Sequence, residues 1–283
     1  MGKRWTWVAW SMLAIFVAAM GVGMALMVVN GEFQQDPAGQ GSLLLAFTAF
    51  MVVGAVVVAR RPGNRVGWVF SAIGLLAGTG LLAWQYAEYA YTTRGGSLPG
   101  AILCAWYTSW WWYPVISLAS LFTLLLFPTG RLLSPRWRPV ALLAAATILA
   151  FIVMSALQPT LGPVGGAEIR NPIGLAAIPD PDASTLGDVL AGLVVVCTGA
   201  AALSLVLRFR RSQGVERQQL KWFTYGGALL FIGLLVSDYL LPGSGLLFGV
   251  AVALLPVAAG IAILRYRLYD IDRLINRTLV YGL

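Results

Sequence analysis

Eight long apolar stretches divide this chain, and nearly all of its positive charges fall in every second gap between them. The stretches cover residues 5–29, 42–59, 67–87, 101–127, 139–157, 187–207, 222–241 and 245–264. Each stretch is long enough to cross roughly 30 Å of hydrocarbon as an α-helix. The pattern therefore predicts an all-α fold, a polytopic transmembrane bundle of eight spans over residues 1–264.

The basic residues indicate which side of the membrane each gap faces. Of the 19 Lys and Arg, all except Arg94 and Arg170 lie before the first stretch, after the last, or in the gaps 60–66, 128–138 and 208–221. Loops rich in Lys and Arg stay in the cytoplasm during insertion. We therefore expect a multi-pass protein of the plasma membrane with both termini in the cytoplasm.

The composition decides between lipid and nucleic acid as the partner of these charges. With 59% hydrophobic and only 11% charged residues, the chain is not an ordinary soluble domain. A formal charge of +8 is also compatible with nucleic-acid binding. Because the basic residues form short clusters at the ends of the spans, the sequence instead predicts contact with the lipid bilayer and its anionic inner-leaflet lipids, and no nucleic acid.

The chain contains no histidine, which excludes several kinds of site within these residues. A His-ligated metal, a His-based catalytic triad and a phospho-accepting histidine all need that side chain. Asp270 and Asp272 form a lone DxD pair, which suits surface ion pairs with nearby arginines better than a metal-dependent enzyme. We expect no catalytic residue, no metal and no cofactor, and two separate thiols at Cys104 and Cys197.

Two aromatic clusters lie where the third stretch ends and the fourth begins, on the predicted outer side. An interfacial belt of Trp and Tyr accounts for such clusters. The alternative is an outward-facing ligand pocket with Glu88 as its polar floor, because the six aromatic residues between 106 and 113 exceed what anchoring requires. The candidate ligand-binding residues are Trp84, Glu88, Trp106, Trp110, Trp111 and Trp112.

Glycine and proline mark contacts and turns along the chain. The pairs Gly74/Gly78 and Gly245/Gly249 have the spacing of close helix contacts in membranes. Pro256 is the only clear breaker expected inside a span. The gap 30–41 is expected to be a short outer loop. The long gap 158–186 holds five prolines, so it is either a flexible outer lid or a small folded cap.

The segment after the last span has the pattern of a linker. Apolar residues recur at helical spacing over 265–277 and charged residues take the other face, which predicts a cytoplasmic amphipathic helix. Candidate signal-output residues on it are Arg265, Arg267, Asp270, Asp272 and Arg273. Residues 278–283 are again apolar, and we expect them to be the start of a truncated further span.

Recognisable motifs occur at the cytoplasmic ends of the spans. They are NRVGW at 64–68, LFPTGRL at 126–132, RW at 136–137, ERQQLKW at 216–222 and IAILRYRLYDIDRLINRTLVYG at 261–282. Together they resemble the amino-terminal membrane module of actinobacterial sensor histidine kinases. In that family the module resembles a membrane-embedded sensor that leads into cytoplasmic signalling and kinase domains. Since this chain has no histidine to phosphorylate, the resemblance implies the sensor role and not the kinase activity.

The expected function is therefore that of a sensory module in a two-component, histidine kinase-like protein. A stimulus at the aromatic clusters or at 158–186 is expected to shift the packing of the later spans and move the linker 265–277. Expected protein partners are a second copy of the chain and a downstream kinase or response regulator. The alternative is a stand-alone small-solute or lipid transporter, although the ionisable groups Glu88 and Asp238 lie near outer ends and not at the midplane.

Overall fold

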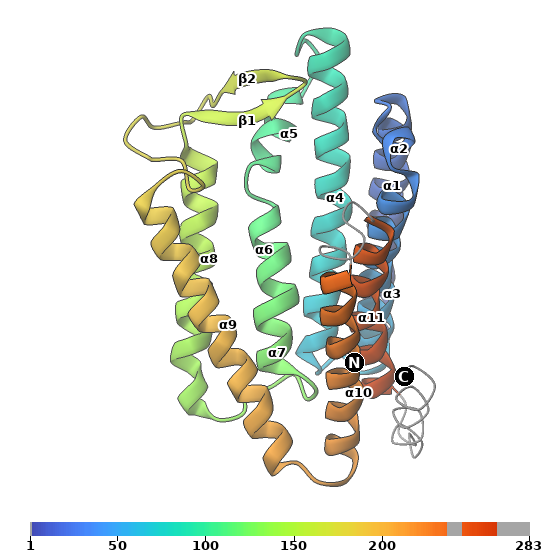
Figure 1. Ribbon diagram of the computed structural model, residues 1–283. Helices are drawn as coiled ribbons and strands as arrows, with labels where there is room; N and C mark the ends of the chain where they lie inside the picture. Colours follow the sequence, from blue (N-terminus) through green and yellow to red (C-terminus); the bar gives the residue numbers. More distant parts are fainter. Residues whose placement is uncertain (1, 237–244, 265–283) are drawn as a thin grey trace.

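The structure is a computed structural model that describes residues 2–236 and 245–264, and most of them are helical (Figure 1). The elements in chain order are α1 (Gly2–Val29), α2 (Glu32–Gln35), α3 (Pro37–Arg60), α4 (Arg65–Arg94), α5 (Ala101–Thr108), α6 (Trp112–Ser117), the π-helix η1 (Leu118–Phe122), α7 (Thr123–Leu126), the 3-10 helix η2 (Pro135–Trp137), α8 (Arg138–Leu157), β1 (Thr160–Val164), β2 (Ala167–Arg170), α9 (Thr185–Arg211), α10 (Gly214–Leu235) and α11 (Gly245–Leu264).

In the described part of the chain, seven helical segments are long and apolar enough to cross a membrane. They cover 4–29, 37–60, 65–94, 101–126, 135–157, 185–211 and 245–264. The chain thus has the helices of an integral membrane protein, as predicted. The predicted span 222–241 is not among the seven: α10 covers its first part but begins with the polar segment 216–221, and residues 237–241 lie outside the described residues. Eight spans are therefore not confirmed.

The chain runs up and down the bundle, so the basic turns meet at one end (Figure 1). Trp5, at the start of α1, packs edge-on against Trp68, at the start of α4, with ring centroids 5.4 Å apart. Ile263, at the end of α11, lies in one buried cluster with Val66 and Leu220. We call this end, which contains the turns 61–64, 127–134 and 212–213, the basic end.

The helices α1, α3, α4 and α11 pack closely because small residues line their contacts. Added side-chain atoms at Gly74 and Gly78 would collide with Met51 of α3 and with Phe16 of α1. At the other predicted pair, Gly245 approaches Gly39, and Gly249 lies against Ser42 of α3. The Ser42 hydroxyl also donates a hydrogen bond of 2.9 Å to the carbonyl of Gly245. Both predicted glycine pairs are therefore confirmed as close helix contacts.

The predicted fourth span is not one continuous helix. It is interrupted by a turn at 109–111 and continues as α6, η1 and α7. Pro114 has no N–H, and its ring would clash with the carbonyl four residues earlier, which explains the break before it. The prediction for Pro256 was wrong, since this buried proline lies inside the continuous helix α11. Its lost hydrogen bond does not end the helix.

The gap 158–186 contains a folded cap and not only a loop. Strand β1 pairs antiparallel with β2, with Leu161 opposite Ile169, and the turn is made by Gly165 and Gly166 at φ of 61° and 74°. Leu161, Val164 and Ile169 are buried against Ala87 and Ala105, so the hairpin packs on α4 and α5. We call the end of the bundle that carries β1 and β2 the hairpin end (Figure 1, top). The hairpin qualifies the all-α prediction, and α2 likewise puts one helical turn into the gap 30–41.

Two predictions at the carboxyl end fall on residues that the structure does not describe. The linker 265–277, with its output residues Arg265, Arg267, Asp270, Asp272 and Arg273, lies outside the described residues. The same holds for the further span expected at 278–283. Both remain predictions.

Candidate functional site

An aromatic cavity of about 230 Å³ lies toward the hairpin end, between α1, α2, α3, α4 and α6. We call it the aromatic pocket; its lining includes Glu32, Phe47, Trp84, Gln85, Trp111 and Trp112. Trp111 and Trp112 come from the interruption of the fourth span, and their rings meet edge to face at 5.2 Å. Trp84 and Trp112 are about two-fifths exposed (40% and 41%), so the pocket is accessible from outside the bundle.

The position of the Trp111 ring depends on a glycine of α4. A side chain at Gly80 would collide with the ring, which lies directly against the α4 backbone. On the other side of the pocket, Phe47 of α3 meets Trp112 edge to face at 6.4 Å. Contacts with α3 and with α4 therefore hold the rings of the pocket, so a movement between these helices changes its shape.

A buried amide forms the polar wall of the pocket. Gln85 is 1% exposed, and its Nε2 donates a hydrogen bond of 2.7 Å to Oε2 of Glu32. Asn30 Nδ2 donates to Gln85 Oε1 at 2.7 Å and to the Gln85 carbonyl at 3.0 Å. The amide is thus satisfied, as a buried polar group must be. These bonds tie the segment after α1 to α4 at the edge of the aromatic rings.

The structure separates the six predicted ligand-binding residues into two groups. Trp84, Trp111 and Trp112 line the aromatic pocket, whereas Glu88, Trp106 and Trp110 do not. Sequence reasoning missed Glu32 and Gln85. Glu32 lies in the gap 30–41, for which the sequence predicts only a short outer loop, and a single Gln in an apolar helix has no periodic signal. The position of Gln85 near the aromatic end of the third stretch was the only sequence feature that pointed to a role in the pocket.

Glu88 holds the hairpin instead of forming the floor of the pocket. Its Oε2 accepts a hydrogen bond of 2.8 Å from the backbone N–H of Gly165, in the turn between β1 and β2. Its Oε1 accepts a second bond from the Thr92 hydroxyl at 3.2 Å. Glu88 lies one helical turn beyond Trp84, so it reaches the hairpin and not the cavity. Glu88 therefore does not line the aromatic pocket, and its predicted place at the floor of an outward-facing pocket is not supported.

Trp106 and Trp110 belong to the packing beneath the hairpin. The Trp106 indole N–H donates a hydrogen bond of 2.8 Å to the Ala156 carbonyl at the end of α8. Its ring packs against the buried hairpin cluster and meets Trp110 edge to face at 5.5 Å. These two rings therefore support α5 and α8 and do not face the aromatic pocket.

A second, more polar cavity of about 280 Å³ lies under the hairpin. Tyr113, Asp180 and Asp182 are among its lining residues, and the Tyr113 hydroxyl donates to Asp182 Oδ1 at 3.3 Å. The Tyr113 ring also stacks on Phe151 of α8, with centroids 4.9 Å apart. The contact between Tyr113 and Asp182 thus connects the segment 178–184 to the interrupted fourth span at this cavity.

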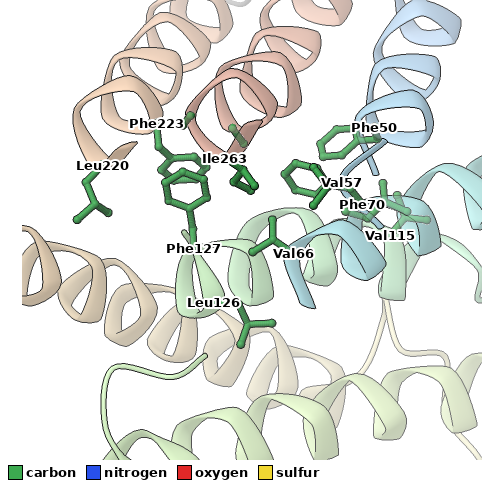
Figure 2. Packing of buried hydrophobic residues seen from close by; sticks show 13 residues of the cluster. Phe50, Val57, Val66, Phe70, Val115, Leu126, Phe127, Leu220, Phe223 and Ile263 are labelled. Carbon is green, nitrogen blue, oxygen red and sulfur yellow. The ribbon is translucent and has the colours of Figure 1, made fainter. Parts of the chain in front are cut away.

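A large apolar cluster at the basic end joins six helices, namely α3, α4, α6, α7, α10 and α11 (Figure 2). Phe127, after α7, stacks on Phe223 of α10 with ring centroids 4.1 Å apart. Val66 of α4, Leu220 of α10 and Ile263 of α11 complete the buried contact. Movement of any one of these helix ends would disturb the others, because close-packed interiors leave little free volume.

Polar contacts lock the turn 127–131 beside this cluster. Asn64 caps α4 by accepting from the Val66 N–H at 3.0 Å, and its Nδ2 donates to the Pro128 carbonyl at 2.9 Å. Arg208 of α9 is 4% exposed and donates to the Arg131 carbonyl at 2.7 Å and to the Thr129 hydroxyl at 3.1 Å. A buried guanidinium therefore binds the turn through oxygen atoms that carry no charge.

The two cysteines and the acidic side chains are the remaining candidates for reactive or metal-binding groups. Cys104 and Cys197 are separate thiols, as predicted. Within residues 2–236 and 245–264, no group of three or more Cys, Asp or Glu side chains is placed to hold a metal ion.

No family model, no curated protein and no solved structure matches this chain. The resemblance of its motifs to sensor kinases therefore stays a prediction.

Proposed function

We propose that the chain is the membrane-embedded sensory module of a two-component, histidine kinase-like protein, without the catalytic part. The observation that carries the proposal is the course of α4. This single helix of 30 residues holds Trp84 and Gln85 in the aromatic pocket and Val66 and Phe70 in the cluster at the basic end. A displacement of α4 at the pocket therefore reaches the basic end without an intervening loop.

The second route between the two ends is α11. It packs along α3 through Gly249 and Gly260, and its last turn places Ile263 in the basic-end cluster. The predicted linker 265–277 follows directly. A ligand or a membrane stress shifts such a system only if it favours one packing over another, typically by about 1–3 kcal/mol. In the proposal, this shift changes the linker and, through it, a downstream kinase or response regulator, in one chain or in a homodimer.

The proposed orientation places the basic end in the cytoplasm of a plasma-membrane protein. The Lys and Arg gathered there favour anionic inner-leaflet lipids, at roughly 1 kcal/mol per charge near the surface. An apolar groove of about 460 Å³ between α9 and α10 supports lipid contact at this end. Val206 and Phe209 line it, and Lys221 lies beside it. The groove thus offers an apolar surface for an acyl chain.

The proposal is tested by cysteine labelling in reconstituted vesicles. Arg267→Cys is introduced into a chain with Cys104→Ala and Cys197→Ala, and the rate of maleimide labelling is measured before and after an osmotic downshift. A sensor predicts a reproducible change in rate at residue 267. An unchanged rate under osmotic stress and under every small solute tested would contradict the proposal.

The transporter alternative is favoured by one observation. The fourth span is interrupted beside Trp111 and Trp112, and broken helices next to a cavity are typical of secondary transporters. Uptake of radiolabelled solutes into the same vesicles separates the two proposals. Saturable uptake that Trp112→Leu abolishes would favour transport, whereas labelling changes without uptake favour a sensor.

A further inference from the structure

We infer that the aromatic pocket binds a small quaternary ammonium group. This ligand class is assigned to the same pocket that takes part in the proposed function. The biological role of the binding rests on that function, but the binding does not. The binding itself follows from the aromatic faces, the carboxylate and the size of the cavity, and it can be measured without any signalling assay.

The aromatic lining is the first argument. Phe47, Trp84, Trp111 and Trp112 line one cavity, and tryptophan has the strongest attraction for a cation over its ring face. The edge-to-face contacts of Trp112 with Phe47 and with Trp111 set neighbouring rings at 89° and 70° to each other. Rings at such angles form the sides of a box and not a flat stack. Aromatic boxes of this kind recognise methylated ammonium groups.

The charge of the pocket is the second argument. Glu32 is a carboxylate on the pocket wall, and no Lys or Arg of the described residues lines the cavity. Oε2 of Glu32 is held by the neutral amide of Gln85, so this contact does not cancel the negative charge. A cation is therefore attracted by Glu32, while an anion is repelled. The Gln85 amide itself is occupied by Glu32 and Asn30, which leaves the carboxylate as the charged group for a ligand.

The size of the cavity limits the ligand. A volume of about 230 Å³ is below the roughly 300 Å³ at which pockets for drug-sized molecules begin. A trimethylammonium group fits this description because it is compact, carries one charge and presents methyl groups to the rings. Two sources offer the same chemistry: a free solute such as choline, and the headgroup of a choline lipid at the membrane surface.

The experiment measures binding of choline and of tetramethylammonium to the protein in maltoside detergent by tryptophan fluorescence and calorimetry. The uncharged isostere of choline, 3,3-dimethylbutan-1-ol, is the matched ligand control. We expect both cations to bind and the alcohol to bind at least about tenfold more weakly. Failure of both cations to bind, or equal binding of choline and the alcohol, overturns the inference.

Variants connect the binding to this pocket. Glu32→Gln keeps an acceptor for Gln85 but removes the charge, and Trp112→Leu removes one wall; each is expected to weaken choline binding about tenfold or more. The matched controls are Glu88→Gln, whose carboxylate holds the hairpin, and Trp7→Leu, whose ring is 74% exposed near the basic end. If both Glu32→Gln and Trp112→Leu bind choline with the affinity of the unaltered protein, the inference is overturned. If one variant does not fold, the other alone decides in the same way.

Lipid nanodiscs distinguish the two sources. If a lipid headgroup is the ligand, discs of phosphatidylcholine occupy the pocket and suppress choline binding, whereas discs of phosphatidylglycerol do not. If a free solute is the ligand, choline binds equally in both. Binding of choline, with labelling at Arg267→Cys unchanged by choline, by every other solute and by osmotic stress, would leave the ligand class standing and contradict the sensor proposal. The two failures are therefore separable.

Discussion

The side-chain amide of Gln85 donates a hydrogen bond of 2.7 Å to the carboxylate of Glu32, and this bond joins α2 to α4 beside the aromatic rings. Gln85 is almost fully buried and also receives a bond from Asn30. One amide thus connects the loop after α1 to the helix that runs on to the basic end. Its loss would loosen both the wall of the pocket and the contact between these elements.

We expect Gln85→Leu to lower the free energy of unfolding by about 1–3 kcal/mol, because Glu32 and Asn30 each lose a buried partner. Thermal unfolding in detergent, followed by circular dichroism, measures the change. Gln34→Leu is the matched control, since Gln34 is exposed and donates a hydrogen bond of 3.1 Å to the nearby Val28 carbonyl. Equal stability of the two variants would show that the buried amide contributes nothing special.

Arg208→Lys tests the lock on the turn 127–131. A lysine cannot reproduce the planar fork that donates to Thr129 and Arg131, so a loss of about 1.5–3 kcal/mol is expected. Arg211→Lys, at an exposed position of the same helix, should change the stability by less than about 0.5 kcal/mol. The lock would be disproved if Arg208→Lys unfolded at the same temperature as Arg211→Lys.

Gly249→Ala tests the contact between α3 and α11. The added methyl group would collide with Ser42, and separating the helices is expected to cost about 1–3 kcal/mol. Gly199→Ala is the control, because an added Cβ there meets no atom within 4 Å. Urea or thermal unfolding compares the two. If Gly249→Ala left the stability unchanged, α3 and α11 would tolerate a wider separation than the one in the structure.

Glu88→Ala tests the attachment of the hairpin. Without the carboxylate, the Gly165 N–H loses its partner. The amides of residues 160–170 are then expected to exchange with deuterium about tenfold faster, which corresponds to a loss of roughly 1.4 kcal/mol in the free energy of opening the hairpin. Glu168→Ala, on the exposed side of β2, should leave the exchange unchanged. Unaltered exchange in Glu88→Ala would assign the hairpin's attachment to apolar packing alone.

The features that could be predicted from the sequence were those that follow from a regular spacing of residues or from the number of charges in each gap. Alternating charge placed the turns at two ends of the bundle, and the glycine spacing located the contacts at Gly74, Gly78, Gly245 and Gly249. These signals are local, because each depends only on how residues repeat along one helix. They established the bundle and its two ends but carried no information on the contents of a pocket.

The features that sequence reasoning missed depend on contacts between distant residues. Glu88 reaches Gly165 across 77 positions, and Gln85 reaches Glu32 across 53. Neither pairing leaves a pattern in a single sequence. The break in the fourth span was missed because Pro114 lies within a long apolar run, where hydrophobicity alone indicates a continuous span. Pro256 was predicted to break its span because proline removes a helix hydrogen bond, yet α11 continues through it.

The coupling of the aromatic pocket to the basic end is tested most directly by a change made in the pocket itself. Spin labels at Arg65→Cys and Gln213→Cys, both exposed at the basic end, report their separation by pulsed electron resonance in nanodiscs, with Cys104 and Cys197 replaced by alanine. Gly80→Ala displaces the Trp111 ring, whereas Gly199→Ala meets no neighbouring atom. Coupling predicts a shifted distance distribution in Gly80→Ala and an unchanged one in Gly199→Ala. Identical distributions in Gly80→Ala, Gly199→Ala and the unaltered chain would contradict it.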